Sequence, residues 1–204
     1  LNAARYAAWS STLTADNARQ ALFAFNGDVY EGLDAWSLNL DDLAWAQDHV
    51  RTLSGLYGVL RPLDWMQPYR LEMGTRLATD AGTNLYQFWG ARIAEHLNRQ
   101  LADDTDPVVV NLASQEYFGV VDPRLIPAEI ISPRFEEITA AGKRRMVSFF
   151  AKRARGAMAG WLVRERVRTP RALKKFAEGG YRYDPATSTT QQPVFVRRYQ
   201  DRPA

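Results

Sequence analysis

The segment Val108-Val-Val-Asn-Leu-Ala-Ser-Gln-Glu-Tyr-Phe118 decides the fold class. Consecutive β-branched residues are typical of a strand that is buried on both faces. Ser114 is a favoured helix N-cap and precedes a short helix predicted over 115–118. We therefore expect a central strand followed by a helix, in an α/β or α+β fold with a mixed β-sheet surrounded by helices.

The rest of the chain alternates between helical and extended patterns. Helices are predicted over 2–9, 14–25, 43–53 and 84–100, with a turn at 26–28 and with Asn39 and Asn84 as caps. Strands are predicted over 69–73, 129–135, 144–150, 181–183 and 194–199. Because no repeat and no obvious linker interrupts the pattern, we expect a single domain over 1–204.

Composition restricts the class of protein. The chain has 204 residues, of which 46% are hydrophobic, so it is long enough to bury a core. The absence of cysteine excludes disulfides, iron–sulfur clusters and thiolate metal sites from this chain. No apolar run approaches the roughly 20 residues that span a bilayer, and no secretory signal is recognisable. We expect a cytoplasmic protein with no membrane partner.

Charge is distributed unevenly along the chain. Residues 1–142 hold 10 basic and 19 acidic residues, whereas residues 143–204 hold 16 basic and 4 acidic residues. Such an asymmetry predicts an anionic partner for the C-terminal third. The alternative is that the two parts neutralise each other within the fold.

The segment after Phe150 is expected to form a helix with an apolar stripe. At helical spacing, one face carries Ala151, Ala154, Met158, Trp161 and Leu162, which predicts a core contact. Gly156 and Gly160 fall on the far side, where another backbone or a phosphate can approach closely. Glu165 falls within the apolar stripe. We expect it to be buried and paired with Arg61, Arg70 or Arg134, unless the helix ends before it.

Basic residues flank that stripe and precede the helix. Arginine suits phosphate recognition because its planar fork donates two parallel hydrogen bonds. The predicted nucleic-acid-binding residues are Lys143, Arg144, Arg145, Lys152, Arg153, Arg155 and Arg164. The alternative is a solvated basic face without a ligand.

A second candidate site lies where the strand over 108–112 ends. Ligands of open α/β sheets bind beyond the carboxyl ends of strands, and a helix start offers free N–H groups to anions. The candidate cleft residues are Asn111, Ser114, Glu116 and Tyr117, with Arg61, Tyr69 and Arg70 expected to face the same cleft. The alternative is ordinary helix capping by Ser114.

Metal and enzyme motifs are weakly represented. His49 and His96 are the only histidines, and neither has the spacing of a ligand set. The sequence has no GxSxG motif, Walker loop or dinucleotide-binding fingerprint. We expect no metal and no cofactor, and no catalytic residue is assigned.

Four stretches together resemble the YaaA (peroxide stress resistance) family. They are LSGLYGVLRPLDWMQPYRLEMG (Leu53 to Gly74), NLYQFWG (Asn84 to Gly90), VVNLASQEYF (Val109 to Phe118) and FFAKRARG (Phe149 to Gly156). Family members begin some fifty to sixty residues earlier, with a strand and a Ser-Pro-Ala-Lys motif, so the resemblance implies that a natural N-terminal segment is missing here.

The resemblance implies a cytosolic protein of the bacterial hydrogen peroxide response that limits damage by free iron. It also implies DNA binding through a positively charged cleft and a helix-hairpin-helix element. Leu1-Asn2-Ala-Ala-Arg5 matches the exit of that hairpin and its second helix.

Three functions remain open at this point. The first is a DNA-binding protein that contacts structured or duplex DNA mainly through phosphates. The second is an enzyme that acts on a nucleotide or nucleobase in the same cleft. The third is a module whose basic end docks an acidic protein.

Overall fold

The computed structural model describes residues 2–202, and contacts between residues divide the chain into two compact units. The first unit comprises Leu1–Phe25, Ala46–Thr105 and Ala113–Pro127. The second unit comprises Asn26–Trp45, Asp106–Leu112 and Ala128–Ala204. Each unit therefore joins segments that lie far apart in sequence.

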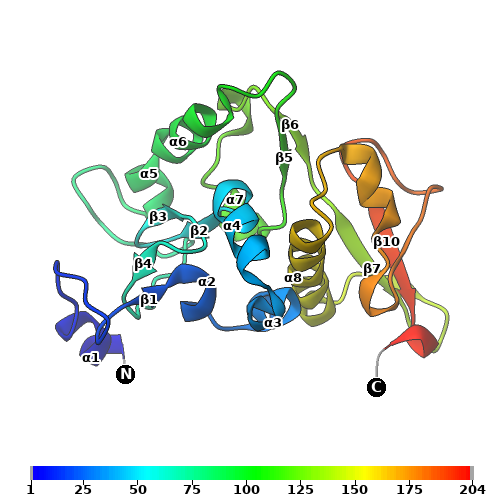
Figure 1. Cartoon of the computed structure of the whole chain (residues 1–204), viewed down its shortest axis with the longest axis horizontal. Helices are drawn as coiled ribbons and strands as arrows, with labels where there is room; N and C mark the ends of the chain where they lie inside the picture. The colour runs from blue at the N-terminus through cyan, green and yellow to red at the C-terminus, as the bar shows by residue number, and fades with distance from the viewer. Residues whose placement is uncertain (1, 203–204) are drawn as a thin grey trace. The chain divides into compact units, whose positions relative to one another are not determined.

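The first unit contains short helices and two small antiparallel sheets (Figure 1). Its helical segments are α1 Asn2–Ala7, α2 Ala21–Ala24, α5 Leu85–Trp89, α6 Arg92–Leu101, α7 Gln115–Phe118 and η2 Pro123–Leu125. Its strands are β1 Arg19–Gln20, β2 Thr52–Ser54, β3 Gly58–Leu60 and β4 Trp65–Met66. β1 pairs with β4 and β2 pairs with β3.

The second unit contains the larger sheet and the longest helix of the described residues. Its helical segments are α3 Asp28–Leu33, η1 Ala35–Ser37, α8 Ser148–Arg164, η3 Pro170–Lys175, η4 Glu178–Gly180 and η5 Tyr199–Asp201. Its strands are β5 Val108–Val110, β6 Glu129–Ile131, β7 Arg134–Ile138, β8 Arg144–Arg145, β9 Arg182–Tyr183 and β10 Val194–Arg198. Helix α4 Leu40–His49 begins in this unit and ends in the first.

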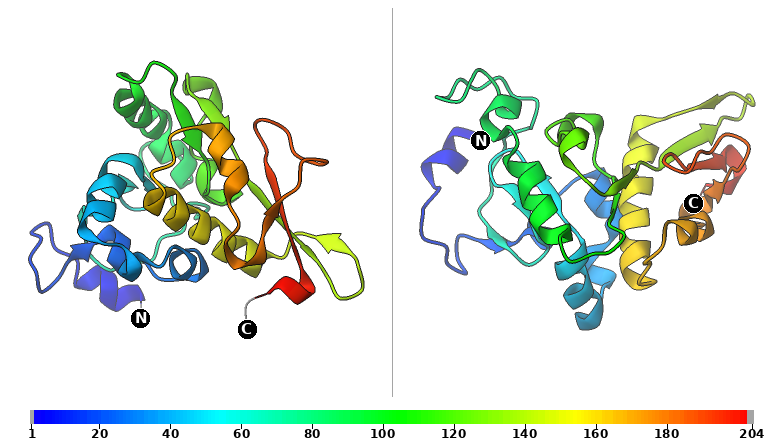
Figure 2. Two further views of the ribbon diagram at one scale, coloured as in Figure 1. Left: turned by 45° about the vertical axis from the view of Figure 1, so that its right-hand side comes forward. Right: turned by 90° about the horizontal axis from the view of Figure 1, so that it is seen from above.

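The four-stranded sheet is mixed. Its order is β8-β7-β10-β9, with β7 and β10 parallel and the two outer pairs antiparallel. Phe135 lies opposite Phe195 in the register, and α8 covers this face of the sheet (Figure 2). The α+β class and the mixed sheet predicted from the sequence are confirmed.

The core of the second unit lies between α8 and the sheet. Phe135 packs against Phe195, Phe176 and Tyr181 with ring centroids 5.3–6.0 Å apart. Ala151, Ala154 and Met158 of α8 belong to this cluster, and Trp161 and Leu162 pack against it. The predicted apolar stripe of α8 is therefore confirmed.

Helices α3 and α8 lie side by side at backbone contact (Figure 1). A Cβ atom on Gly156 would overlap the carbonyl oxygen of Val29, and one on Gly160 would lie 2.5 Å from that of Leu33. The two α8 glycines thus admit another backbone, which leaves no room beside them for a phosphate. Gly27, with φ of 132°, is the N-cap residue of α3 at the predicted turn.

Several predicted caps are confirmed. Asn39 Oδ1 accepts a hydrogen bond from Asp42 N at 2.9 Å, and Asp42 Oδ2 accepts one from Asn39 N, which closes a reciprocal cap at the start of α4. Asn84 caps α5, and Ser114 caps α7 through Tyr117 N. The predicted helix over 84–100 is divided at Gly90, whose φ is 50°.

Four predicted elements differ from the structure in their bounds or type, and one of them, the strand over 69–73, is wrong. Residues 14–18 form turns because the Asn17 side chain bonds to the backbone of Thr12 and Thr14, and β1 follows. The helix over 43–53 ends at His49, since 52–54 is strand β2. Residues 69–73 form no strand, and the predicted strand over 144–150 is reduced to β8 because α8 begins at Ser148.

The strand over 108–112 exists but is not central. Among the described residues β5 pairs with β6 alone, in a parallel two-stranded sheet, and its three valines are half-buried. The run of β-branched residues therefore predicts the strand correctly, but it predicts deeper burial than the structure shows. The predicted partnership of β9 and β10 is confirmed, with Phe195 opposite Tyr183.

Candidate functional site

Two of the predicted α8 cations are exposed and lie at the start of the helix. Lys152 and Arg153 follow the first turn, and Lys152 Nζ lies 3.9 Å from Oδ2 of the half-buried Asp28, a weak contact at the surface. Arg164 lies at the other end of α8, about 16 Å along the axis from Arg153. It pairs with Glu178 at 2.8 Å. The four predicted α8 cations are therefore not one compact patch.

Arg155 is the half-buried member of the predicted set. Burial lowers the pKa of its guanidinium, and its Nε donates to Ala151 O of the same helix. Within the described residues no carboxylate forms an ion pair with it. A desolvated guanidinium without a carboxylate partner is well suited to an anion.

The hairpin between β7 and β8 carries the other three predicted cations. Lys143 and Arg145 are exposed, whereas Arg144 bonds Glu136 and Asp184, the latter at 2.6 Å, and donates to Thr187 Oγ1 at 2.7 Å. The Arg144 guanidinium is therefore already bonded to two carboxylates of its own chain. Lys143 and Arg145 remain candidates for an external anion.

The second unit partly neutralises its own charge. It holds 17 basic and 13 acidic residues, because 26–45 contributes five acids and no base. Asp28 contacts Lys152, and Asp42 pairs with Arg166 at 3.0 Å. The alternative of internal neutralisation thus explains part of the charge asymmetry.

A set of exposed cations in the second unit has neither a carboxylate ion pair nor, unlike Arg182, a side-chain hydrogen bond to the backbone within residues 2–202. Its members are Lys143, Arg145, Arg153, Arg168, Arg171, Lys174, Lys175 and Arg198. Five of them were not predicted as binding residues. The sequence alone could have indicated the segment from Arg168 to Lys175 as a binding surface, because it carries four cations and no acid.

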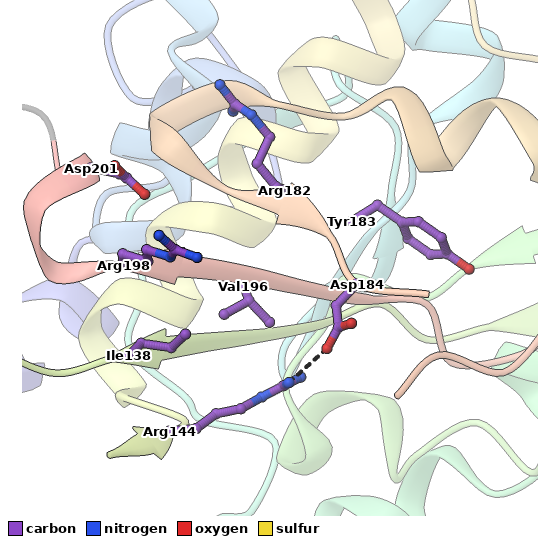
Figure 3. Close-up of a pocket in the computed structure, with 8 residues that line it drawn as sticks. All are labelled: Ile138, Arg144, Arg182, Tyr183, Asp184, Val196, Arg198 and Asp201. Atoms are coloured by element: carbon purple, nitrogen blue, oxygen red, sulfur yellow. Dashed lines mark hydrogen bonds and ion pairs between the residues drawn. The ribbon is translucent and has the colours of Figure 1, made fainter. Parts of the chain in front are cut away.

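The face of the sheet turned away from α8 forms a pocket (Figure 3). Its volume is about 440 Å³, and it is lined by Ile138, Arg144, Arg182, Tyr183, Asp184, Val196, Arg198 and Asp201. The register places Ile138 between Arg144 and Arg198, and Val196 opposite Arg182. Sequence patterns missed this site because it depends on pairing between strands that are distant in sequence.

The three arginines of this pocket differ in whether their guanidinium groups already bond to other groups of the protein. Arg182 Nη1 donates to the carbonyls of Ala177 and Tyr181, both at 2.8 Å, and Arg144 is bound to carboxylates. Arg198 is exposed on the last residue of β10. Of the three pocket arginines, Arg198 alone therefore adds to the available cations.

The predicted cleft residues fall in both units. Asn111 belongs to the second unit, where its Nδ2 contacts Ser132 Oγ at 3.2 Å. Ser114, Glu116 and Tyr117 belong to the first unit, on α7 and its cap. Glu116 Oε1 accepts a hydrogen bond from Gly74 N at 3.0 Å. Capping by Ser114 is confirmed, and Glu116 fastens α7 to the loop after β4.

Arg61 and Arg70 are satisfied locally. Arg61 pairs with Asp64 at 2.9 Å, and Arg70 pairs with Glu72 at 3.0 Å. Tyr69, between β4 and α5, bonds Ser54 Oγ at 2.6 Å, and burial raises its pKa to about 12. Burial, with nearby Glu116 and Glu72, also raises the pKa of Tyr117. Both phenols therefore remain protonated at neutral pH.

Glu165 is exposed, and the prediction that it is buried with an arginine is wrong. Helix α8 ends at Arg164, and Glu165 is its C-cap residue, with no ion pair among the described residues. The helix reaches the surface before the apolar stripe would have buried a charge.

Metal ligands and membrane spans are not found in the described part of the chain. Within residues 2–202 no three His, Cys, Asp or Glu side chains are grouped as metal ligands. No helix of these residues has both the length and the apolar character to cross a bilayer. The predicted second helix of a helix-hairpin-helix coincides with α1, while Leu1 lies outside the described residues and the hairpin stays a prediction.

Known proteins resemble this chain over most of its length. A family model described as "Peroxide stress protein YaaA" matches residues 1–187. A UPF0246 protein of Paracidovorax citrulli is 64% identical over 198 residues, which cover 97% of this chain and 76% of that protein. UPF0246 proteins of a Polaromonas species and of Cupriavidus pinatubonensis are 58% and 57% identical, over 97% and 98% of this chain and 76% and 78% of theirs. On this evidence the chain belongs to the peroxide stress protein YaaA family.

Proposed function

We propose that this protein binds DNA through the exposed cations of its C-terminal third and so limits iron-dependent oxidative damage to DNA. The observation that carries the proposal is the excess of exposed cations that have no carboxylate partner among the described residues. Residues 143–204 contain four acids, and Glu178 and Asp184 are already paired with Arg164 and Arg144. The remaining positive charge requires an external anion or counterions from solvent.

The chemistry of these cations favours phosphate contacts. Lys143, Arg145 and Arg153 are exposed and lie within eleven residues of one another. Each phosphate that such a side chain neutralises releases condensed counterions, which supplies affinity without reading base sequence. Binding to structured or duplex DNA, rather than to one sequence, is the expected result.

Membership of a peroxide stress family supplies the physiological context. Hydroxyl radicals form where iron reacts with peroxide, so a protein that covers the phosphate backbone competes with iron for the same anionic sites.

A triple substitution tests the proposal. Lys143→Gln, Arg145→Gln and Arg153→Gln together remove three exposed cations that stabilise no ion pair of the described structure. The matched control replaces Arg61, Arg70 and Arg124, which are exposed and paired with neighbouring carboxylates of the first unit. We expect the first variant to bind duplex DNA more weakly and the control to bind as the wild type does.

Protection against iron is measured on supercoiled plasmid treated with ferrous iron and peroxide. The wild type is expected to slow strand breakage, and the Lys143/Arg145/Arg153 variant is expected to protect less at equal concentration. Equal protection by both would separate the peroxide function from these cations and contradict the proposal.

A further inference from the structure

A strongly basic stretch of the second unit also exposes two large apolar side chains. Residues 143–155 contain six basic residues and no acid. Within this stretch Phe149 is 47% exposed and Met146 is 62% exposed. We define the Phe149 surface as Lys143, Arg145, Met146, Phe149, Lys152 and Arg153.

Helix geometry places cations beside the exposed ring. Phe149 lies in the first turn of α8, and Lys152 and Arg153 follow it at i+3 and i+4, the positions that neighbour it on a helix surface. Arg145 ends β8 and Met146 follows it, so both precede α8 closely in the sequence. An aromatic face is thus bordered by positive charge on both sides along the chain.

The adjacent Phe150 packs against the Phe149 ring and supports it. The Phe149 and Phe150 rings meet edge to face with centroids 5.4 Å apart. The guanidinium groups of Arg197 and Arg202 lie over Phe150 at 4.8 and 4.3 Å, and both arginines bond Glu137. Phe150 is therefore covered by cations of its own chain, whereas almost half of Phe149 remains open to a ligand.

Exposure alone does not single out Phe149. Trp36 is 77% exposed and Leu40 is 83% exposed, but they lie in the 26–45 segment with five acids and no base. Tyr199 is 55% exposed beside Arg198, but the guanidinium of Arg202 already lies over its ring at 4.7 Å. The Phe149 surface instead combines an open ring with nearby cations that lack strong carboxylate partners. That combination is how proteins bind single strands, because a base stacks on the aromatic ring while the cations follow the phosphates.

We propose that the Phe149 surface binds unpaired nucleotides, stacking a base on Phe149 while Lys143, Arg145 and Arg153 contact the flanking phosphates. The inference rests on the proposed DNA-binding function and adds a preference for single-stranded segments. Base stacking tolerates any sequence, since every base has a π face, so the preference is for strandedness.

The test compares a single-stranded oligonucleotide carrying one central 2-aminopurine with a fully paired duplex of equal length. The proteins are the wild type, Phe149→Ala, the conservative Phe149→Tyr and the control Trp36→Ala, each checked by thermal melting. Phe149→Ala is expected to weaken single-strand binding by about 5- to 150-fold, the range for removal of one stacking platform, with duplex binding nearly unchanged. Phe149→Tyr is expected to keep both the affinity and the 2-aminopurine quenching of the wild type. Trp36→Ala is expected to alter neither.

Different failures have different meanings. If Phe149→Ala binds the single strand and quenches 2-aminopurine as the wild type does, while duplex binding persists, the stacking proposal is overturned and the proposed function stands. If the wild type binds neither nucleic acid, both are overturned. Anionic lipid vesicles provide a further arm. Phe149-dependent vesicle binding, with Phe149-independent oligonucleotide binding, would assign the surface to membranes and overturn the inference.

Discussion

At the residue scale, the contact between α3 and α8 depends on the missing side chain of Gly156. A Cβ atom there would overlap the carbonyl of Val29, and neither backbone can move without separating the helices. We expect Gly156→Ala to lower the free energy of unfolding by about 1–3 kcal/mol, although alanine is the better helix former. Urea denaturation measures the change, with Ala159→Gly as a control for helix propensity alone. A stabilised Gly156→Ala variant would contradict the close contact.

Tyr69 offers a second residue-scale test, through pH. Burial raises its folded pKa to about 12 from 10.0, partly offset by its hydrogen bond to Ser54. The unfolded chain therefore loses this proton first. The contribution of Tyr69 to the free energy of unfolding is fully present below pH 10 and falls as pH rises from 10 towards 12. The decrease is of the order of 2–3 kcal/mol. We expect unfolding of Tyr69→Phe to depend less steeply on pH in this interval, and parallel profiles would refute the assignment.

Single residues also show what the sequence could predict at the site. Lys143, Arg145 and Arg153 were predicted and are exposed, since long charged side chains normally remain in solvent. Arg144 and Arg164 were predicted with them but bond to carboxylates 40 and 14 residues further along the chain. No local sequence pattern distinguishes a cation that is available to a ligand from one that already pairs with a carboxylate distant in the sequence.

At the element scale, a buried carboxylate joins β7 to the C-terminal segment. Glu137 is 1% exposed and accepts hydrogen bonds from Tyr181 Oη at 2.6 Å and from Arg197 and Arg202 at 3.0 Å. Glu137→Gln would leave the buried Arg197 without its counter-charge. We expect destabilisation by about 3–5 kcal/mol in thermal or urea unfolding. Asp122→Asn, in a surface pair with the exposed Arg124, is the control and should leave stability nearly unchanged.

Elements with strong local signals were predicted well. Helix α8 has a long apolar stripe, and the caps of α4, α5 and α7 use side chains that bond within three residues. The strand predicted over 69–73 is not formed. The alternation of apolar and polar residues there reflects separate side-chain contacts, such as the hydrogen bond between Tyr69 and Ser54. Apolar alternation predicts a buried side chain on alternate residues but does not supply a partner strand.

At the scale of the whole molecule, the charge asymmetry of the sequence has two outcomes. Acidic residues of 26–45 enter the second unit and contact Lys152 and Arg166, which the linear sequence cannot reveal. The cations beyond that neutralisation remain exposed, from Lys143 to Arg198. The assignment of a DNA-binding role depends on this remainder rather than on the net charge of the chain.

The most direct test of that role is the dependence of duplex DNA affinity on salt, measured for the wild type and the Lys143/Arg145/Arg153 triple glutamine variant. If all three cations neutralise phosphates, the slope of log K against log salt should become shallower by about 0.9 for each phosphate that is no longer neutralised, nearly 3 in total. The Arg61/Arg70/Arg124 control should keep the wild-type slope. An unchanged slope and affinity in the triple variant would contradict the claim that these residues bind DNA.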